Sequence, residues 1–82
     1  MFGVNRKMKL VKIIIPERYL EHYPKPYKME RARVFYQKYG VLKERIVIDK
    51  HTNKLIDGYT SYLVAYENCL KKVEVIKASK EE

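Results

Sequence analysis

The nine residues LIDGYTSYL, 55–63, join an apolar segment to a helix through a tight corner. The apolar pair at its start is typical of a short buried strand, and Asp57-Gly58 then turns the chain. Gly58 permits backbone dihedral angles that a β-carbon would forbid, and the Asp57 carboxylate is suited to accept hydrogen bonds from the first N–H groups of a helix. The stretch therefore predicts a strand, a corner and a helix that starts near Tyr59.

The same corner is also typical of a phosphate site. The first turn of a helix offers unpaired N–H groups and the positive end of the helix dipole, and the hydroxyl groups of Thr60 and Ser61 would add two donors. Asp57 could then hold a magnesium ion that accompanies the phosphate. In the alternative interpretation, Asp57 caps the helix through the N–H of Tyr59 or Thr60, and no ligand binds. The stretch is not a G-x-x-x-x-G-K-[ST] loop, so both interpretations stay open.

The segments around the corner predict a hairpin before it and an amphipathic helix at 59–70 after it. Strands are expected at 45–48 and 54–56, joined by a short loop in which Asn53 takes the left-handed conformation. Cys69 lies beside the apolar stripe of the helix and is expected to be a core thiol. The stripe should supply the main helical contribution to the core. It consists of Tyr59, Tyr62, Leu63, Tyr66 and Leu70.

Four further segments complete the expected fold. A β-branched strand at 9–15 ends at a proline, and a short helix follows at 17–22. A second helix at 27–39 ends at Gly40, and a valine-rich strand lies at 72–76. The order β-α-α-β-β-α-β predicts an α+β domain with a small mixed sheet. The apolar face of the second helix is formed by Ala32, Phe35, Tyr36 and Tyr39.

Length and charge favour one small basic domain. The chain has 82 residues, enough for a single domain over 1–82, with flexible ends expected at 1–7 and 78–82. Its 18 Lys and Arg against 10 Asp and Glu give a net charge of +8, which favours nucleic acid, a nucleotide or an acidic protein surface as partner. The cations recur along the whole chain, which argues against a single dedicated DNA groove.

The sequence argues against a disulfide-bonded, a zinc-binding and a membrane-spanning protein. Cys69 is the only cysteine, so an internal disulfide is excluded, and two histidines offer too few ligands for a structural zinc ion. No apolar run is long enough to span a bilayer, and the start of the chain does not have the pattern of a signal peptide. We expect a cytoplasmic protein without a cofactor, unless a nucleotide binds together with Mg²⁺ at Asp57.

The run RIVIDKHTNKLIDGYTSYLVAYENCLKKVEVI, 45–76, resembles the N-terminal domain of ParB-type partition proteins and the wider ParB/sulfiredoxin-like superfamily. The shared pattern is an apolar strand, a turn, a second strand that ends in Leu-Ile-x-Gly, a helix and a short valine strand. The opening LVKIIIPERYL, 10–20, is also similar, so the resemblance covers most of residues 8–77. It implies a small mixed sheet and a phosphate or nucleotide site at the corner.

The departures from the family pattern concern the corner itself. Partition proteins carry Gly-Glu-Arg-Arg and serine-kinase-like members carry Asp-Gly-His-His-Arg, where this chain has DGYTS at 57–61. Sulfiredoxins need Gly-Cys-His-Arg, so their chemistry is excluded here. In all three patterns an arginine falls at the position of Ser61, where it would grip phosphate with two parallel hydrogen bonds. The site is therefore either a weakened phosphate binder, assisted by Lys28 or Lys54, or a relic.

The preferred function is that of a small basic ParB-like module, from a phage, plasmid or other mobile element, that binds a nucleotide or nucleic-acid phosphate. Partition proteins also carry a helix-turn-helix and a dimerisation region, which these 82 residues do not include, so operator binding of that kind is not expected. The phosphate would bind at Asp57, Gly58, Tyr59, Thr60 and Ser61, and further contacts to nucleic acid or a partner would come from Lys25, Lys28, Arg31 and Lys54.

Two alternatives belong to other classes. The chain could be a non-catalytic accessory or inhibitor protein that docks on an acidic partner through a basic, tyrosine-rich surface. The candidate anchors are Tyr19, Tyr23, Tyr27 and Arg31. The chain could also be a magnesium-dependent phosphotransferase or nuclease that uses Asp57 with Glu17 or Glu21, although the replaced arginine argues against an enzyme.

Overall fold

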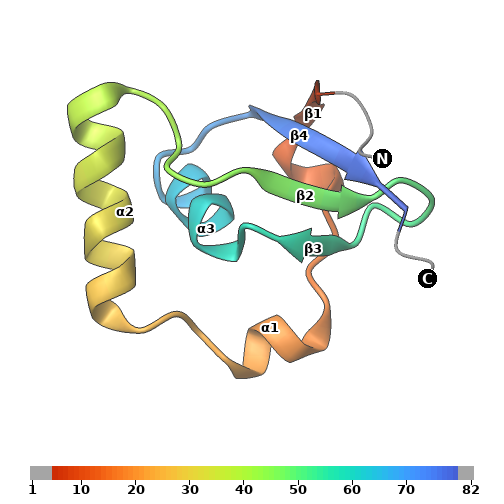
Figure 1. Cartoon of the computed structure of the whole chain (residues 1–82), viewed down its shortest axis with the longest axis horizontal. Coiled ribbons are helices and arrows are strands. Elements are labelled where there is room, and N and C mark those ends of the chain that lie inside the picture. Colours follow the sequence, from red (N-terminus) through yellow and green to blue (C-terminus); the bar gives the residue numbers. More distant parts are fainter. Residues whose placement is uncertain (1–4, 80–82) are drawn as a thin grey trace.

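The strands of the chain pair into one four-stranded mixed sheet, in the order β1-β4-β2-β3 (Figure 1). The structure, a computed structural model, describes residues 5–79. The predicted α+β class with a small mixed sheet is confirmed. In chain order the elements are β1 (Asn5–Lys9), the 3₁₀ helix η1 (Leu10–Lys12), α1 (Glu17–Glu21), α2 (Pro26–Tyr39), β2 (Ile46–Asp49), β3 (Leu55–Asp57), α3 (Tyr59–Glu67) and β4 (Lys72–Ala78).

β2 and β3 form the predicted antiparallel hairpin, and β4 lies between β2 and β1. β4 runs parallel to β2, with Ile46 opposite Val75, and antiparallel to β1, with Met8 opposite Val73. In the hairpin loop Asn53 has φ 63°, so the predicted left-handed residue is confirmed. β2 and β3 each lie one residue later than predicted, and β4 extends two residues further.

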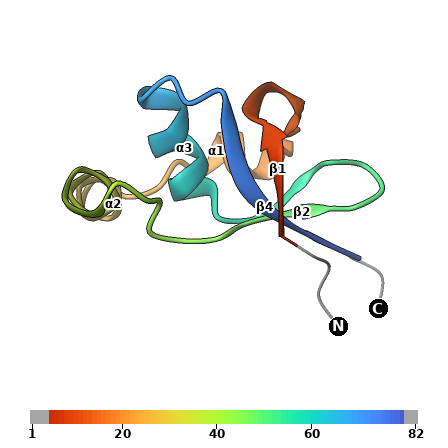
Figure 2. The same cartoon turned by 90° about the horizontal axis from the view of Figure 1, so that it is seen from above.

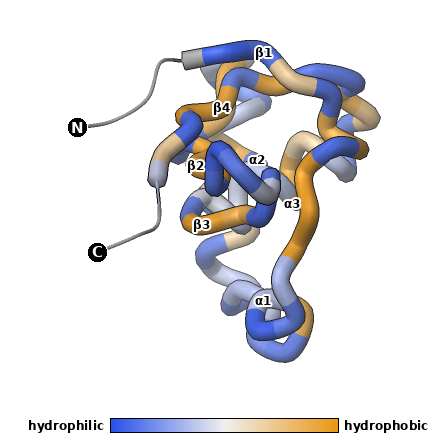
Figure 3. The backbone as a smooth tube through the Cα atoms, turned by 90° about the vertical axis from the view of Figure 1, so that its right-hand side faces the viewer, coloured by the Kyte–Doolittle hydropathy of each residue, from blue (hydrophilic) through white to orange (hydrophobic). Residues whose placement is uncertain are grey.

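The strand predicted at 9–15 is wrong, because β1 ends at Lys9 and the chain turns into η1. Leu10 and Ile13 are both buried, and a period of three residues brings side chains at this spacing to one side of the turn. In a strand they would point to opposite faces, and one of them would leave the core. Figure 3 shows the segment between η1 and α1 as a hydrophobic stretch that leads away from the sheet.

α3 begins at Tyr59 as predicted and ends three residues earlier than predicted. The predicted stripe is only partly its buried face, since Tyr59 is buried together with Ser61, Val64 and Ala65, whereas Tyr66 is 67% exposed. Ser61 and Ala65 are four residues apart, so their small side chains lie on one face and let the helix approach the sheet closely. Of the other stripe residues, Tyr62, Leu63 and Leu70 are partly buried and pack against the core.

The end of α3 is closed by backbone hydrogen bonds of its own. The N–H of Leu70 donates to the C=O of Ala65 at 3.0 Å, and the N–H of Cys69 donates to the C=O of Tyr66 at 3.1 Å, the pattern of a Schellman motif. Cys69 is the left-handed residue of this motif, with φ 58°, and it is exposed. The prediction of a core thiol is therefore wrong, because the helix ends before Cys69 and the turn points it outward.

The predicted second helix and its C-cap glycine are confirmed, the glycine with φ 72°. The buried residues of α2 are Met29 and Ala32, which pack with Val64 of α3. The predicted apolar face is only partly right, since Tyr39 is 56% exposed. Met29, Ala32 and Tyr36 pack in the cluster that α2 forms with α3, and Tyr39 lies outside this cluster.

α3 lies against one face of the sheet, and α2 packs against α3. Figure 2 shows α1 and α3 on the same side of β2 and β4.

No helix between residues 5 and 79 is long and apolar enough to cross a bilayer. Of the ends predicted to be flexible, residues 5–7 belong to β1 and residue 78 to β4, and 1–4 and 80–82 lie outside the described residues. The main core consists of Leu10, Ile13, Ile46, Ile48, Leu55, Tyr59, Ala65, Val73 and Val75.

Candidate functional site

The corner between β3 and α3 is pressed against the start of β2. Gly58 has φ 92°, in the left-handed region that favours glycine. A β-carbon at this position would lie 2.2 Å from the C=O oxygen of Arg45 and 2.9 Å from the Cα of Ile46. Both the backbone conformation and the close approach therefore require glycine at position 58.

Ser61 is buried and has a structural role. It is 1% exposed, and its Oγ accepts a hydrogen bond of 2.9 Å from the backbone N–H of Glu44. The contact of Gly58 with Arg45 and the hydrogen bond that the Glu44 N–H donates to Ser61 together fix the segment that leads into β2. The Ser61 hydroxyl is thus engaged by the protein itself, and at this position the family resembled by the sequence carries an arginine.

The Asp57 carboxylate does not cap α3. Its Oδ1 accepts a hydrogen bond of 2.9 Å from the N–H of Gly58, whereas the cap predicted for it would take the N–H of Tyr59 or Thr60. The first bond of the helix runs from the N–H of Tyr62 to the C=O of Gly58 at 3.0 Å. Among residues 5–79, no protein acceptor binds the three N–H groups of the first turn of α3.

Tyrosine rings form one flank of the corner. Tyr59 is 9% exposed, and its ring centre lies 5.0 Å from that of Tyr19 and 6.3 Å from that of Tyr62. The hydroxyl of Tyr19 donates to the C=O of Ile56, which ties α1 to β3. Burial, with a smaller contribution from the neighbouring Tyr23, raises the pKa of the Tyr59 phenol above its usual range. The flank therefore stays uncharged at neutral pH.

Arg45 is the cation that the fold places beside the corner, and the sequence interpretation missed it. An open hollow of about 520 Å³ is lined by Arg45 and Asp57, together with Glu44, Val47 and Ile76. The hairpin register pairs Val47 with Asp57, and Arg45 lies two residues before Val47 on the same face of the sheet. The sequence does not give this register, and without it nothing places Arg45 near Asp57.

The cations predicted from the sequence lie elsewhere. Lys54 precedes β3 and Asp57 ends it, so a three-residue rise of about 10 Å separates them. Lys25, Lys28 and Arg31 lie at the start of α2, and none of them lines the hollow beside the corner. None of these four residues lines the hollow that holds Arg45 and Asp57, and their contacts to nucleic acid or a partner stay a prediction.

The acidic residues do not form a metal centre in the described part of the chain. Within residues 5–79, no three His, Cys, Asp or Glu side chains gather closely enough to hold a metal ion. Glu17 and Glu21, proposed as partners of Asp57, are the first and last residues of the short helix α1. Asp57 shares its hollow with a different carboxylate, that of Glu44.

The fold has counterparts among solved structures. One form of a pNOB8-like ParB N-domain matches with a TM-score of 0.79 at 16% identity, over 99% of this chain and 31% of that chain. A second structure of the pNOB8-like ParB N-domain matches with a TM-score of 0.77 at 16% identity, over 99% and 29%. This chain thus spans about three tenths of those chains. No family model and no curated protein sequence matches it.

Proposed function

We propose that this ParB N-domain-like fold binds a phosphate group of a nucleotide or nucleic acid at the start of α3, without catalysing a reaction on it. The observation that supports this most is the first turn of α3, whose N–H groups have no protein acceptor among the described residues. Such groups, with the helix dipole behind them, favour an anion. In this proposal the N–H groups of Tyr59 and Thr60 and the Thr60 hydroxyl bind the phosphate.

The charges around the corner require a cation for this binding. Asp57 is exposed and carries a negative charge that repels phosphate. A magnesium ion between the Asp57 carboxylate and a phosphate oxygen would remove that repulsion, and carboxylate together with phosphate is its usual ligand set. Arg45, in the same hollow, would add a positive charge that the engaged Ser61 does not supply.

Melting temperature tests the proposal. The chain is heated with each common nucleoside triphosphate, a short DNA duplex and a short DNA single strand, each with and without Mg²⁺. A ligand at 100 times its dissociation constant should add about 2.7 kcal/mol of stability. We expect a rise with at least one Mg²⁺-containing mixture, and we expect Thr60→Ala and Arg45→Ala to reduce it. Lys50→Ala removes a cation from the hairpin loop and is the matched control. The absence of any rise contradicts the proposal.

A protein partner is the second candidate function, and the surface at the start of α2 favours it. Tyr23 and Tyr27 are 59% and 53% exposed, and the Arg31 guanidinium lies 5.5 Å from the centre of the Tyr27 ring. Exposed tyrosine and arginine are typical anchors of interfaces. Tyr19 does not belong to this surface, because its hydroxyl is engaged by the fold. Capture of an acidic partner that Tyr27→Ala abolishes, without any nucleotide response, supports this candidate over the first.

The predicted mobile-element source and cytoplasmic location remain predictions. Both come from the resemblance and composition of the sequence, and the similarity to the pNOB8-like ParB N-domain concerns the fold.

A further inference from the structure

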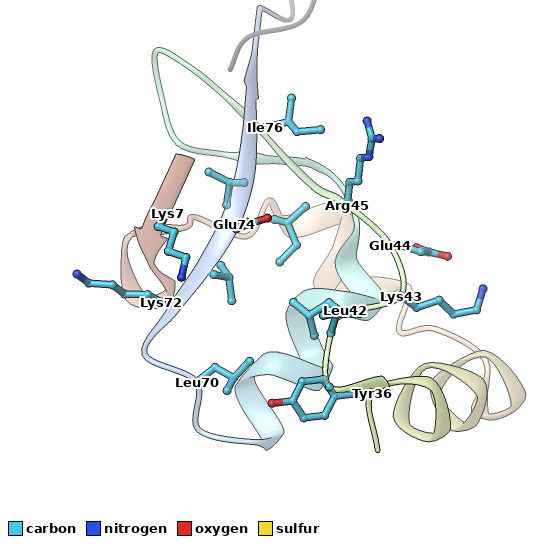
Figure 4. A pocket seen from close by; sticks show the side chains of 15 residues that line it. Lys7, Tyr36, Leu42, Lys43, Glu44, Arg45, Leu70, Lys72, Glu74 and Ile76 are labelled. Carbon is cyan, nitrogen blue, oxygen red and sulfur yellow. The ribbon is translucent and has the colours of Figure 1, made fainter. Parts of the chain in front are cut away.

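A groove of about 560 Å³ opens between β4 and residues 40–45, the segment that leads into β2 (Figure 4). We call the space between Lys72–Val75 and 40–45 the β4 groove. Apolar side chains line its interior and cationic side chains stand along its rim. Among the apolar residues are Leu42, Leu70, Val73 and Val75.

The corner at the start of α3 explains why this groove exists. β2 pairs with β4 only from Ile46 opposite Val75 onward, so residues 43–45 do not continue the ladder. They are held at α3 instead, by the bond from the Glu44 N–H to Ser61 and the contact of Arg45 with Gly58. The divergence of the two segments leaves one side of β4 without a neighbouring strand over Lys72–Glu74.

The backbone of β4 presents unpaired groups to this groove. The N–H of Leu10 donates to the C=O of Lys71 at 2.9 Å, and strand alternation then turns the polar groups of Val73 toward β1. The N–H of Lys50 donates to the C=O of Ala78 at 3.0 Å, so the residues of even number in β4 face β2. The N–H and C=O of Lys72 and the N–H of Glu74 therefore point into the groove, where β2 has not yet begun.

The rim of the β4 groove is predominantly positive. Figure 4 shows Lys7 and Lys72 on one side and Lys43 and Arg45 on the other. No ion pair with another described residue engages these four side chains, since the ion pair within residues 5–79 joins Arg33 to Glu67. The groove thus combines an unpaired strand edge, an apolar interior and excess positive charge.

We propose that the β4 groove binds a short extended peptide rich in acidic residues, which adds as a strand to the Lys72–Glu74 edge. Main-chain hydrogen bonds to a free sheet edge give such complexes affinity, and pockets for alternate side chains give them specificity. The free edge covers three residues, about 10 Å, so the bound core of the peptide is three to four residues long. Acidic residues are required because the rim cations face the positions that flank this core.

A labelled seven-residue peptide in which valine alternates with glutamate tests this proposal on the full chain. We expect saturable binding, with new protection from hydrogen exchange at the amides of Lys72 and Glu74. The amide of Val73 serves as an internal reference, because β1 already binds it. Two control peptides have lysine in place of glutamate or proline at the centre, and neither should bind.

A charge-reversed pair of variants separates the groove from general charge attraction. Lys43→Glu with Lys72→Glu should weaken binding about tenfold or more. Lys12→Glu with Lys50→Glu changes the net charge equally at exposed sites outside the groove and should leave binding unchanged. All four side chains are exposed, so both chains should fold, which circular dichroism checks.

Several results would overturn the proposal. They are absence of binding at millimolar peptide, equal binding of a control peptide, an equal loss in the two double variants, and protection at the outer edge of β1 in place of Lys72 and Glu74. Competition by a short DNA single strand that gives the same amide protection would instead identify the groove as a nucleic-acid site.

Discussion

The two ends of α3 are finished in different ways. At its C-terminal end, the amides of Cys69 and Leu70 return to carbonyls of the last turns and close the helix. At its N-terminal end, no described residue caps the first turn, and the nearest carboxylate binds Gly58 instead. The last turn is thus closed by neighbouring groups, including the Asn68 side-chain amide, which donates to the C=O of Val64 at 2.8 Å, whereas the N–H groups of the first turn have no acceptor among the described residues.

The left-handed residues at the two ends of α3 differ in the same way as the ends themselves. Cys69 has φ 58° and bears an exposed side chain, so only the local turn sets its conformation. Gly58 has φ 92° and lies against the backbone of Arg45, so both the turn and a distant segment depend on it. Substitutions at the N-terminal end should therefore cost more than substitutions at the C-terminal end.

Gly58→Ala should have the largest effect. The left-handed conformation and the clash with the Arg45 carbonyl together should lower the free energy of unfolding by about 3–5 kcal/mol. Gly40→Ala is the matched control, since Gly40 has φ 72° but nothing lies within 4 Å of an added β-carbon. It should cost about 1 kcal/mol. Urea unfolding measures both, and equal losses would contradict the role given to the Arg45 contact.

Ser61→Ala should have the next largest effect. It leaves the Glu44 N–H without its acceptor and should cost about 1–2 kcal/mol in urea unfolding. Thr60→Ala, one residue away, removes a hydroxyl to which we assign no role in the fold and should change stability by less than about 0.5 kcal/mol. A loss in Thr60→Ala as large as that in Ser61→Ala would show that the Glu44 bond is not the cause.

Cys69→Gly should stabilise the protein. Glycine adopts the left-handed conformation without the penalty of a β-carbon, so the free energy of unfolding should rise by about 0.5–1 kcal/mol. Thermal unfolding under reducing conditions measures the change. A destabilised variant would mean that the Cys69 side chain contributes contacts that its exposure does not indicate.

The ion pair near the C-terminal end of α3 should give the smallest effect and a pH dependence. Arg33 binds Glu67 through two hydrogen bonds of 2.9 and 2.8 Å, and this bonding holds the pKa of the Glu67 carboxyl below its usual range. Because the folded pKa is lowered, the stabilisation is present above the ordinary carboxyl pKa and is lost as pH falls through the folded value. The gap in melting temperature between the unchanged chain and Glu67→Gln should therefore be small at pH 7 and vanish once the pH lies below the lowered pKa of Glu67 in the folded chain.

Local signals predicted much of this fold. The left-handed residues at Asn53 and Gly40 and the start of α3 at Tyr59 all follow from turn and cap chemistry within a few residues. The β-branched run after Lys9 led to the wrong prediction of a strand. The spacing of Leu10 and Ile13 also suits a 3₁₀ turn, and the contact of this turn with α3, which the local sequence does not show, favours the turn.

The candidate site was less predictable than the fold. Residue types at the corner were recognised, but the burial of Ser61 and the place of Arg45 both depend on segments more than ten residues away. The tyrosine stripe of α3 was only partly right, since Tyr59 is buried and Tyr66 is exposed, and periodicity alone does not say which face of a helix meets the sheet. The buried face uses the smaller residues Ser61 and Ala65.

The contrast between the two ends of α3 is tested most directly by amide NMR shifts during titration with Mg²⁺ and inorganic pyrophosphate. We expect the amide resonances of Tyr59 and Thr60 to shift to saturation, while those of Cys69 and Leu70 stay in place. Unmoved resonances at Tyr59 and Thr60, or equal shifts at the two ends of the helix, would contradict a phosphate site at the start of α3.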